Sequence, residues 1–363
     1  MMERKRLSYS DYLQLDSILS AQQLRSAEQG ITAHEEMLFI IVHQAFELWF
    51  KQLLWELRDA ITRIGQDYVP ESDVGIALDR VRRMLVIMDL LERQFDVLET
   101  MTPSQFMEFR DQLYPASGFE SVQFRMLEVA LGLDERVRVQ IDTAGYRARL
   151  RQEDQAALDS VAQQPTFFTA IERWLEKMPF MELGSYRFLD AYRQAVERIF
   201  AHDREELAKI TTLNPDERIR QKEQIARLEA HFAALFDEQA YQALQEQGEK
   251  RLSQRATLAA LFITVYANYP LLQQPYRLLD AVLELDKQVS MFRFRHAMMV
   301  SRMIGQRTGT GGSSGFDYLM ATVLRHRVFA DLAALSSYIL PSSHVPPLPD
   351  DIAHKLHFVA EIS

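Results

Sequence analysis

Hydrophobic residues recur along this chain mainly with the period of an α-helix. Between residues 33 and 65 they return at helical intervals, and Gly65 supplies a stop at the end of the run. The alternation of apolar and polar residues that is typical of a half-buried strand is hard to find anywhere. The pattern therefore predicts an all-α protein. Further helices are expected over 79–100, 160–183, 191–210, 215–247, 256–269 and 275–303.

The stretch from 165 to 248 differs in composition from the rest of the chain. It is rich in Glu, Gln, Lys and Arg, and its apolar stripes are narrower than elsewhere. At 363 residues the chain is also long for one compact domain. We therefore expect a helical bundle core from residues 1–164 and 249–363, with 165–248 inserted as a smaller helical lobe. The alternative is one continuous bundle without a separable lobe.

Charge and cysteine content exclude several classes of function. The net charge is −10 and no basic patch stands out, which argues against a nucleic acid partner. Cysteine is absent, so disulfides and thiolate chemistry are excluded, which fits a reducing cytoplasm. The N-terminus turns polar at once, unlike a signal peptide. The longest apolar stretch, 256–269, is too short to span a bilayer, so we expect a soluble cytoplasmic protein without a membrane partner.

Two histidines lie in apolar surroundings. Helical spacing places His43 on one face with Phe39, Phe46 and Phe50, where burial favours a neutral imidazole suited to an aromatic substrate pocket. His296 lies between an arginine-bearing stretch and two methionines, and an imidazole there suits axial ligation of haem iron. The alternative for each is a buried structural histidine.

A third candidate follows a helix-start signal. Thr102 can cap, with Pro at the next position and Gln105 completing a capping box. If the helix continues, Phe106 and Arg110 share one face. There a guanidinium could clamp a carboxylate while the ring packs the apolar part of a substrate. The alternative is a surface arginine paired with a nearby acidic residue.

Five of the 13 glycines are concentrated between residues 305 and 315. A loop this rich in Gly, Thr and Ser allows the backbone to approach a ligand closely and can direct several N–H groups at an anion. It lacks the Walker lysine and follows no strand, so it is neither a P-loop nor a Rossmann turn. We expect a ligand-gripping loop, and the alternative is a passive linker.

Taken together, these segments closely resemble the tryptophan 2,3-dioxygenase family, helical haem enzymes that open the indole ring of tryptophan. The similarity covers most of the chain, from about residue 7 to 346, and is weakest across the predicted lobe. Several independent motifs occur in the family's order, which makes the resemblance specific. The matching stretches are Tyr9–Leu13, Glu36–Lys51, Phe109–Phe119, Arg295–His296 and Gly309–Gly315.

The resemblance implies a role for each candidate residue. His296 matches the axial ligand of the iron in haem b, and His43 matches the residue that accepts the indole N–H. Phe39 and Phe106 match rings that enclose the indole, and Arg110 matches the residue that binds the substrate carboxylate.

The remaining matched positions lie in the loop, near the haem and at the N-terminus. Thr310 matches the loop hydroxyl that meets the amino-acid end of the substrate. Ser117, Gly118 and Arg125 match positions near the haem. By the resemblance, Arg125 pairs with a haem propionate. The family is a homotetramer, and the segment 1–20 matches one that reaches a neighbouring subunit's site. Its matched residues are Tyr9, Tyr12 and Leu13.

Two positions depart from the family's pattern. Phe292 stands near the haem, four residues before His296, where the family often carries Trp, so an indole N–H that could bond a propionate is missing. Phe46 stands where Tyr is common. Neither change touches the reacting atoms.

By this resemblance the chain cleaves the indole C2–C3 bond of L-tryptophan with dioxygen. The product is N-formyl-L-kynurenine, and the reaction is the first step of tryptophan catabolism by the kynurenine route. One alternative is a related haem enzyme that inserts a single oxygen into tryptophan or a substituted indole. Another is a non-catalytic haem sensor, which would need neither Arg110 nor the Thr310 loop.

Overall fold

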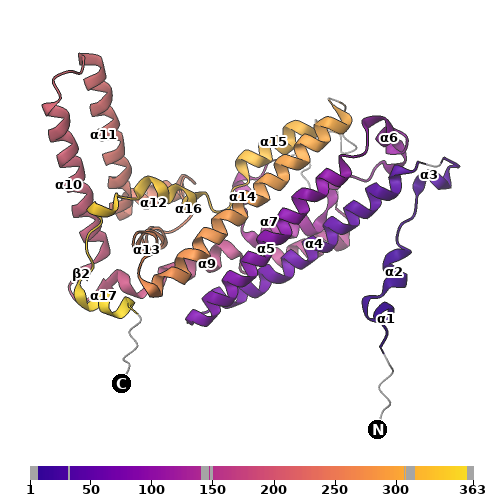
Figure 1. Ribbon diagram of the computed structural model, residues 1–363, viewed down its shortest axis with the longest axis horizontal. Helices are drawn as coiled ribbons and strands as arrows, with labels where there is room; N and C mark the ends of the chain where they lie inside the picture. The colour runs from indigo at the N-terminus through magenta and orange to yellow at the C-terminus, as the bar shows by residue number, and fades with distance from the viewer. Residues whose placement is uncertain are drawn as a thin grey trace, which may run out of the picture.

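Long helices dominate the computed structural model of this protein (Figure 1). The structure describes residues 7–31, 33–139, 147, 150–305, 307 and 315–357. Within those ranges the only strands are β1 (Glu182–Leu183) and β2 (Tyr186–Arg187), which form a two-stranded antiparallel hairpin. The predicted all-α fold is therefore confirmed.

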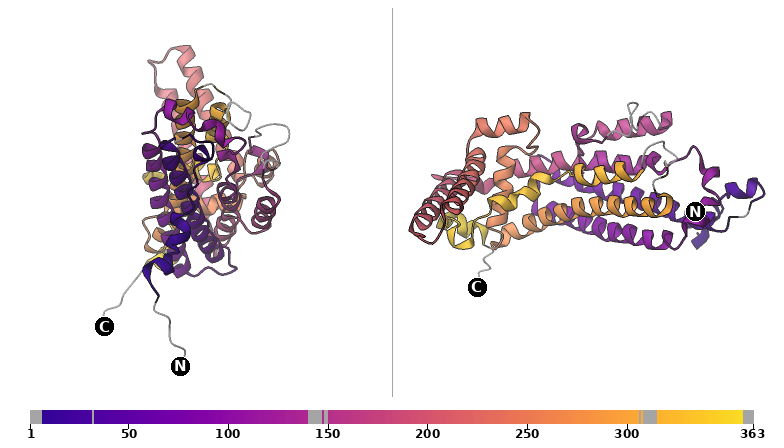
Figure 2. Two further views of the ribbon diagram at one scale, coloured as in Figure 1. Left: turned by 90° about the vertical axis from the view of Figure 1, so that its right-hand side faces the viewer. Right: turned by 90° about the horizontal axis from the view of Figure 1, so that it is seen from above.

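Three long helices form the body of the molecule. α4 (Glu35–Ile64), α5 (Glu71–Leu98) and α14 (Pro270–Ile304) run side by side, with α5 against both of the others (Figures 1 and 2). α7 (Val122–Leu131) lies against α4, and α15 (Gly315–Arg325) lies against α14. These helices confirm the predictions for 33–65, 79–100 and 275–303, because each buries an apolar stripe in the shared core.

The expected helix over 160–183 is wrong, because the chain folds there as two helices and a hairpin. α8 (Gln152–Ala162) ends before Pro165, and α9 (Phe167–Glu176) begins anew. Thr166 caps α9, since its hydroxyl accepts the N–H of Thr169 while the Thr169 hydroxyl accepts the N–H of Thr166. This reciprocal cap ends one helix and starts the next.

The predicted helix over 215–247 is also divided in two. α11 (Pro215–Phe236) stops at Asp237, whose carboxylate accepts the N–H of Ala240 and so caps α12 (Glu238–Glu246). The hairpin of α10 (Phe188–Lys209) and α11 projects from one end of the body (Figure 1). α9, which also falls within 165–248, packs on α4 and on α13 (Gln254–Val265). The lobe boundaries stay a prediction.

Short helices close the two ends of the chain. α1 (Tyr9–Leu13) and α2 (Leu15–Leu19) bury no residue and hang away from the body, and α3 (Arg25–Glu28) leads back to it (Figure 1). At the other end lie α16 (Ala330–Ala334) and α17 (Asp350–Leu356).

Among the described residues, α4 alone is long and apolar enough to cross a membrane by length and composition. The apolar window of α4 is 28% buried, and the helix contacts α5 and α7.

Candidate functional site

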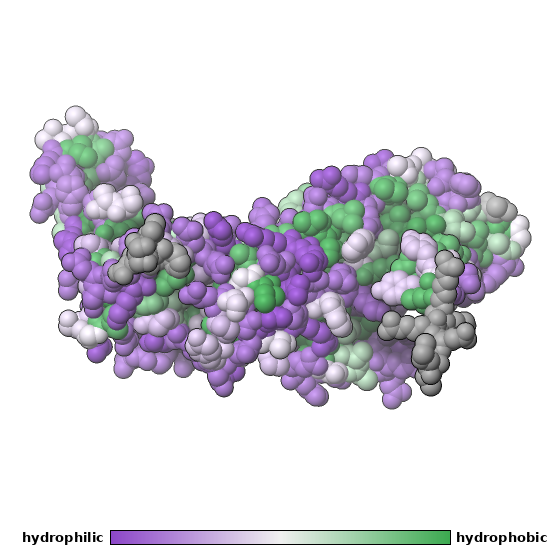
Figure 3. Space-filling model, turned by 60° about the horizontal axis from the view of Figure 1, so that its bottom comes forward, coloured by the Kyte–Doolittle hydropathy of each residue, from purple (hydrophilic) through white to green (hydrophobic). Residues whose placement is uncertain are grey.

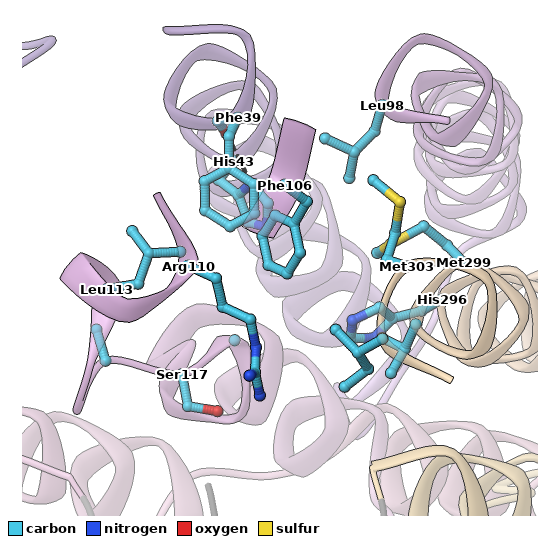
Figure 4. A pocket seen from close by; sticks show the side chains of 14 residues that line it. Phe39, His43, Leu98, Phe106, Arg110, Leu113, Ser117, His296, Met299 and Met303 are labelled. Atoms are coloured by element: carbon cyan, nitrogen blue, oxygen red, sulfur yellow. Dashed lines mark hydrogen bonds between the residues drawn. The ribbon is translucent and has the colours of Figure 1, made fainter. Parts of the chain in front are cut away.

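A cavity of about 140 Å³ opens between α4, α14 and the segment that follows α5. Phe39 and His43 line it from α4, and His296 lines it from α14. In Figure 4 the Phe106 ring and the His296 imidazole project into this space from different sides, and the Arg110 side chain reaches in beside Ser117. The walls are otherwise mainly apolar. They include Leu98, Leu113, Met299, Val300, Met303 and Ile304.

Phe106 and Arg110 reach the cavity from two different short helices. α6 (Pro103–Met107) starts with the predicted capping box, in which the Thr102 hydroxyl accepts the N–H of Gln105. The helix ends after Met107, and Arg110 begins a separate 3₁₀ helix. The predicted pairing on one helical face is therefore wrong, yet both side chains line the same cavity because the chain turns between them.

A second cavity, of about 110 Å³, adjoins the first and shares His43, Gly118, His296 and Met299 with it. One end of the second cavity is aromatic and the other is polar and charged. The aromatic residues are Phe46, Phe50, Phe95, Phe124 and Phe292, and the polar and charged residues are Glu47, Ser121, Arg125, Glu128, Arg293, Tyr318 and Thr322.

The His43 ring is held in one tautomer by its own helix. Nδ1 lies 2.7 Å from the backbone carbonyl oxygen of Phe39, which can only accept a hydrogen bond, so Nδ1 carries the proton. Burial lowers the pKa of His43, although this hydrogen bond and the charge of Glu47 act in the opposite direction. The neutral ring therefore has an unprotonated Nε2, which can accept one hydrogen bond from a ligand.

His296 has a different environment. Burial lowers the pKa of His296 to about 4, with smaller contributions from His43 and Arg125. Its ring lies nearly parallel to that of Phe95, with 6.0 Å between the ring centroids. In the described part of the chain no hydrogen bond holds either ring nitrogen. A neutral imidazole with this freedom can present a lone pair to a metal ion.

The two positions that depart from the family pattern contact one another. The rings of Phe46 and Phe292 meet edge to face, with 5.7 Å between their centroids. Phe292 also packs against Phe50, Phe95 and Phe124, so it lies at the centre of an aromatic cluster. Each ring supplies apolar surface alone, so these two positions add no hydrogen-bonding group to the second cavity.

Charged residues form a buried cluster at the other end of that cavity. Arg125 donates to the Glu128 carboxylate at 2.9 Å and to the Tyr318 hydroxyl at 3.4 Å. Arg293 and His326 also bond Glu128. The sequence reasoning did not single out Glu128 or His326. An acidic residue three positions after Arg125 on an otherwise apolar helix was the available signal, whereas nothing in the sequence around His326 marks it.

Comparison with known proteins adds independent evidence. A sequence profile described as tryptophan 2,3-dioxygenase matches residues 1–339. A protein of that name from Bdellovibrio bacteriovorus is 42% identical, over 96% of this chain and 98% of its own length. One from Xenopus laevis is 43% identical, over 98% of this chain and 87% of its own length. A Dictyostelium discoideum protein of the same name is 39% identical, over 99% and 90%.

This chain belongs to the tryptophan 2,3-dioxygenase family. The resemblance drawn from its motifs is thus confirmed, and the chain is an enzyme of this dioxygenase family. The roles of individual residues are a separate matter, because family membership does not assign them.

Most predicted site residues of this family member meet at the two cavities. Phe39, His43, Phe106, Arg110, Ser117, Gly118 and His296 line the first, and Arg125 and Phe292 line the second. Tyr9, Tyr12 and Leu13 line neither cavity, since α1 lies away from the body of its own chain. Thr310 lies outside the described residues.

The paired cavities fit a haem. The family implies this cofactor, and the second cavity offers aromatic walls for a flat apolar ring. His296 supplies a neutral imidazole at the junction of the cavities, and Arg125 supplies a cation for an acidic substituent. Arg295 faces elsewhere, because it pairs with Asp96 on α5.

Proposed function

We propose that this chain cleaves the C2–C3 bond of L-tryptophan with dioxygen and forms N-formyl-L-kynurenine. The proposal rests on one observation. A single cavity brings together a guanidinium, two phenyl rings, a histidine with a free acceptor nitrogen, and a second neutral histidine. These groups match the carboxylate, the indole ring and the indole N–H of tryptophan, together with an iron ligand. The relatives named above carry the same activity in their names.

Haem b, held by His296 and accompanied by Arg125, would supply the redox chemistry through which dioxygen reacts with a closed-shell indole. The residues of the second cavity fit that cofactor in shape and polarity. Aromatic rings, Phe292 among them, would pack its apolar faces, and the charged end would receive its acidic groups.

The protein's own residues then act by positioning the substrate. Arg110 binds the carboxylate of tryptophan, and two hydrogen bonds from its planar guanidinium fix both distance and direction. Phe39 and Phe106, whose ring centroids are 5.8 Å apart, pack the indole. Nε2 of His43 accepts the indole N–H. An indole N–H is a very weak acid, so His43 orients the ring and need not remove its proton.

Holding the reactants in this geometry supplies much of the rate enhancement, because the entropy of alignment is lost on binding. Ser117 lines the first cavity and Gly118 lines both, so Gly118 belongs to the wall between substrate and cofactor and Ser117 lies beside it. Thr310 is proposed to meet the amino-acid end of the substrate on the basis of the family motif alone.

Isotope labelling tests this proposal. The purified haem-loaded protein is given L-tryptophan under ¹⁸O₂, and the product is identified by mass. Incorporation of two labelled atoms supports the dioxygenase activity. A single label would assign the chain to the alternative reaction that inserts one oxygen, and no product with intact haem binding would favour a sensor.

We also propose a homotetramer. α1 leaves Tyr9 and Tyr12 exposed by 74% and 72%, so a neighbouring chain could cover them. On α4, Ile41, Leu48 and Trp55 recur every seven residues and are exposed by 48%, 57% and 73%, an apolar stripe suited to packing against another helix. Figure 3 shows apolar side chains gathering on the broad end of the molecule, whereas the projecting hairpin is mostly hydrophilic.

Light scattering tests the assembly. The wild type is expected at four times the chain mass, and Leu48→Glu at a lower mass because it places a charge in the stripe. Ile219→Glu, an exposed apolar position on α11, is the control and should keep the wild-type mass. A wild-type protein at a single chain mass contradicts the tetramer.

We propose a cytoplasmic location and a role in the first step of tryptophan catabolism. The absence of cysteine is compatible with a reducing compartment. Cell fractionation with an antibody to the chain tests the location.

A further inference from the structure

Glu128 lies at the centre of the buried charged cluster beside the second cavity. Its side chain is 1% exposed. One carboxylate oxygen accepts hydrogen bonds from Arg125 at 2.9 Å and Arg138 at 2.8 Å. The other accepts from Arg293 at 2.8 Å and from His326 at 3.3 Å. One carboxylate thus joins α7, the segment after α7, the helix that carries His296, and the residue just after α15.

His326 adds no charge to this cluster. The backbone N–H of Val139 donates to its Nε2 at 2.9 Å, so that nitrogen carries no proton. Nδ1 then holds the ring's proton and donates it to Glu128. Burial lowers the pKa of His326, which agrees with a neutral ring.

Arginine side chains are the main partners of Glu128 in this cluster. Three guanidinium groups donate to the buried carboxylate, and Glu135, which pairs with Arg138, is 61% exposed and largely screened by solvent. Burial alone raises the pKa of Glu128, but the surrounding cations and His326 outweigh it and hold that pKa well below its usual range. Removing the buried carboxylate would leave its cationic partners without this compensation.

Part of the cluster faces the cavity. Arg125, Glu128 and Arg293 line the second cavity together with Tyr318, whose hydroxyl also accepts a hydrogen bond from Arg125. Arg293 is on the same helix as His296, one turn earlier, and Arg125 is on α7. Glu128 bonds both arginines, so it connects α7, whose Arg125 would face the acidic groups of the cofactor, with α14, whose His296 would hold its iron.

We propose that Glu128 is a positioning residue for the cofactor: it fixes the Arg125 guanidinium at the cavity wall and holds α7 at a set position relative to the helix of His296. This inference rests on the proposed haem site. Without the carboxylate, the three guanidinium groups repel one another and Arg125 loses the bond that sets its direction. Haem would then leave more readily even though its axial ligand and aromatic walls are unchanged.

Haem dissociation tests the inference. Transfer of haem from the loaded protein to an excess of apomyoglobin gives the dissociation rate without any measurement of turnover. Glu128→Gln keeps the size of the side chain and removes its charge, and it should release haem at least tenfold faster than the wild type. Glu135→Gln removes the exposed carboxylate that also bonds Arg138, and it should stay within twofold. Release from Glu128→Gln within twofold of the wild type overturns the inference.

A double-mutant comparison separates positioning from a general structural role. If Glu128 acts through Arg125, adding Glu128→Gln to an Arg125→Gln protein should speed haem release by a smaller factor than in the wild type, because only the link to Arg293 on α14 is left to lose. Equal fold-changes in both backgrounds overturn the inference, whatever happens to the melting temperature.

A milder variant covers the case in which Glu128→Gln does not fold. Tyr318→Phe removes the hydroxyl that bonds Arg125 and should speed haem release by a smaller factor in the same direction, whereas an unchanged rate contradicts the positioning of Arg125. If the wild type itself takes up no haem, the proposed function fails, and that result is distinct from a wild type and Glu128→Gln that release haem equally slowly.

Discussion

The two histidines of the site are both half-buried and neutral, yet their surroundings leave them different chemistry. His43 on α4 donates Nδ1–H to the carbonyl of Phe39, which fixes its tautomer and reserves Nε2 as an acceptor. His296 on α14 has no such bond among the described residues, and burial lowers its pKa to about 4. A fixed acceptor suits recognition of an N–H group, and an unconstrained lone pair suits a metal ion.

Both histidines line both cavities, but the side chains next to each ring differ. The His43 ring contacts Phe39, and both line the first cavity together with Arg110. This combination fits a zwitterionic aromatic substrate. His296 adjoins Phe95 and Phe292 and faces the charged end of the second cavity, which fits a flat cofactor with acidic groups. The hydrogen bond to the ring, more than burial, distinguishes the two roles.

Removing His296 should have the largest effect. His296→Ala takes away the only proposed axial ligand, so the purified protein should lose its haem Soret band in the visible spectrum. His202→Ala removes an exposed histidine on α10 and should leave the band unchanged. An unaltered spectrum in His296→Ala would mean that another residue holds the iron.

Removing Arg110 should affect substrate binding with haem content unchanged. Arg110→Ala should raise KM for L-tryptophan by the equivalent of roughly 2–4 kcal/mol, as for a broken charge pair that is shielded from water. Arg82→Ala, at an exposed position on α5, is the control for loss of a guanidinium. A change in KM of less than twofold contradicts the carboxylate clamp.

Enlarging Phe292 on α14 should lower the stability of the fold without weakening tryptophan binding. Phe292→Trp inserts a larger ring among four phenyl rings, so the free energy of unfolding should fall by about 1–3 kcal/mol. Denaturant unfolding measures this, with the half-buried Phe294→Trp as control. If KM for tryptophan rises as much as in Arg110→Ala, the aromatic cluster around Phe292 is not separate from the substrate site around His43.

His43 should give the smallest change. His43→Ala removes one hydrogen bond, so kcat/KM should fall by the equivalent of about 0.5–1.5 kcal/mol. Because burial lowers the pKa of His43 below its ordinary 6.5, Nε2 stays an acceptor at pH 6.5 and is lost only at lower pH. The wild-type pH profile of kcat/KM should therefore stay level down to pH 6.5 and fall below it. Near-normal turnover and affinity in His43→Ala refute the orienting role.

Sequence patterns were sufficient to predict the elements that are determined by their own residues. The long apolar stripes of α4, α5 and α14 and the capping box at Thr102 each have a local cause, and each was predicted. The motif around His43 and His296 also identified the family, because several short matches occurred in one order.

Some of what the sequence analysis missed has a local cause, and the rest depends on tertiary contacts. Asp237 caps α12 and the paired threonines cap α9, so these two breaks are local signals that the helical period alone did not show. Glu128 and His326 lie 198 positions apart, and only folding brings them together. The meeting of Phe46 with Phe292 is likewise a property of packing, since neither residue alone indicates the other.

The most direct test of the central claim is a titration of the ferrous haem-loaded protein with L-tryptophan, followed through its visible spectrum. If cofactor and substrate share the site between His43 and His296, saturating tryptophan should shift the Soret band. The shift should persist in Arg82→Ala and require far more tryptophan in Arg110→Ala. A Soret band that saturating tryptophan leaves unchanged in the wild type would contradict the shared site.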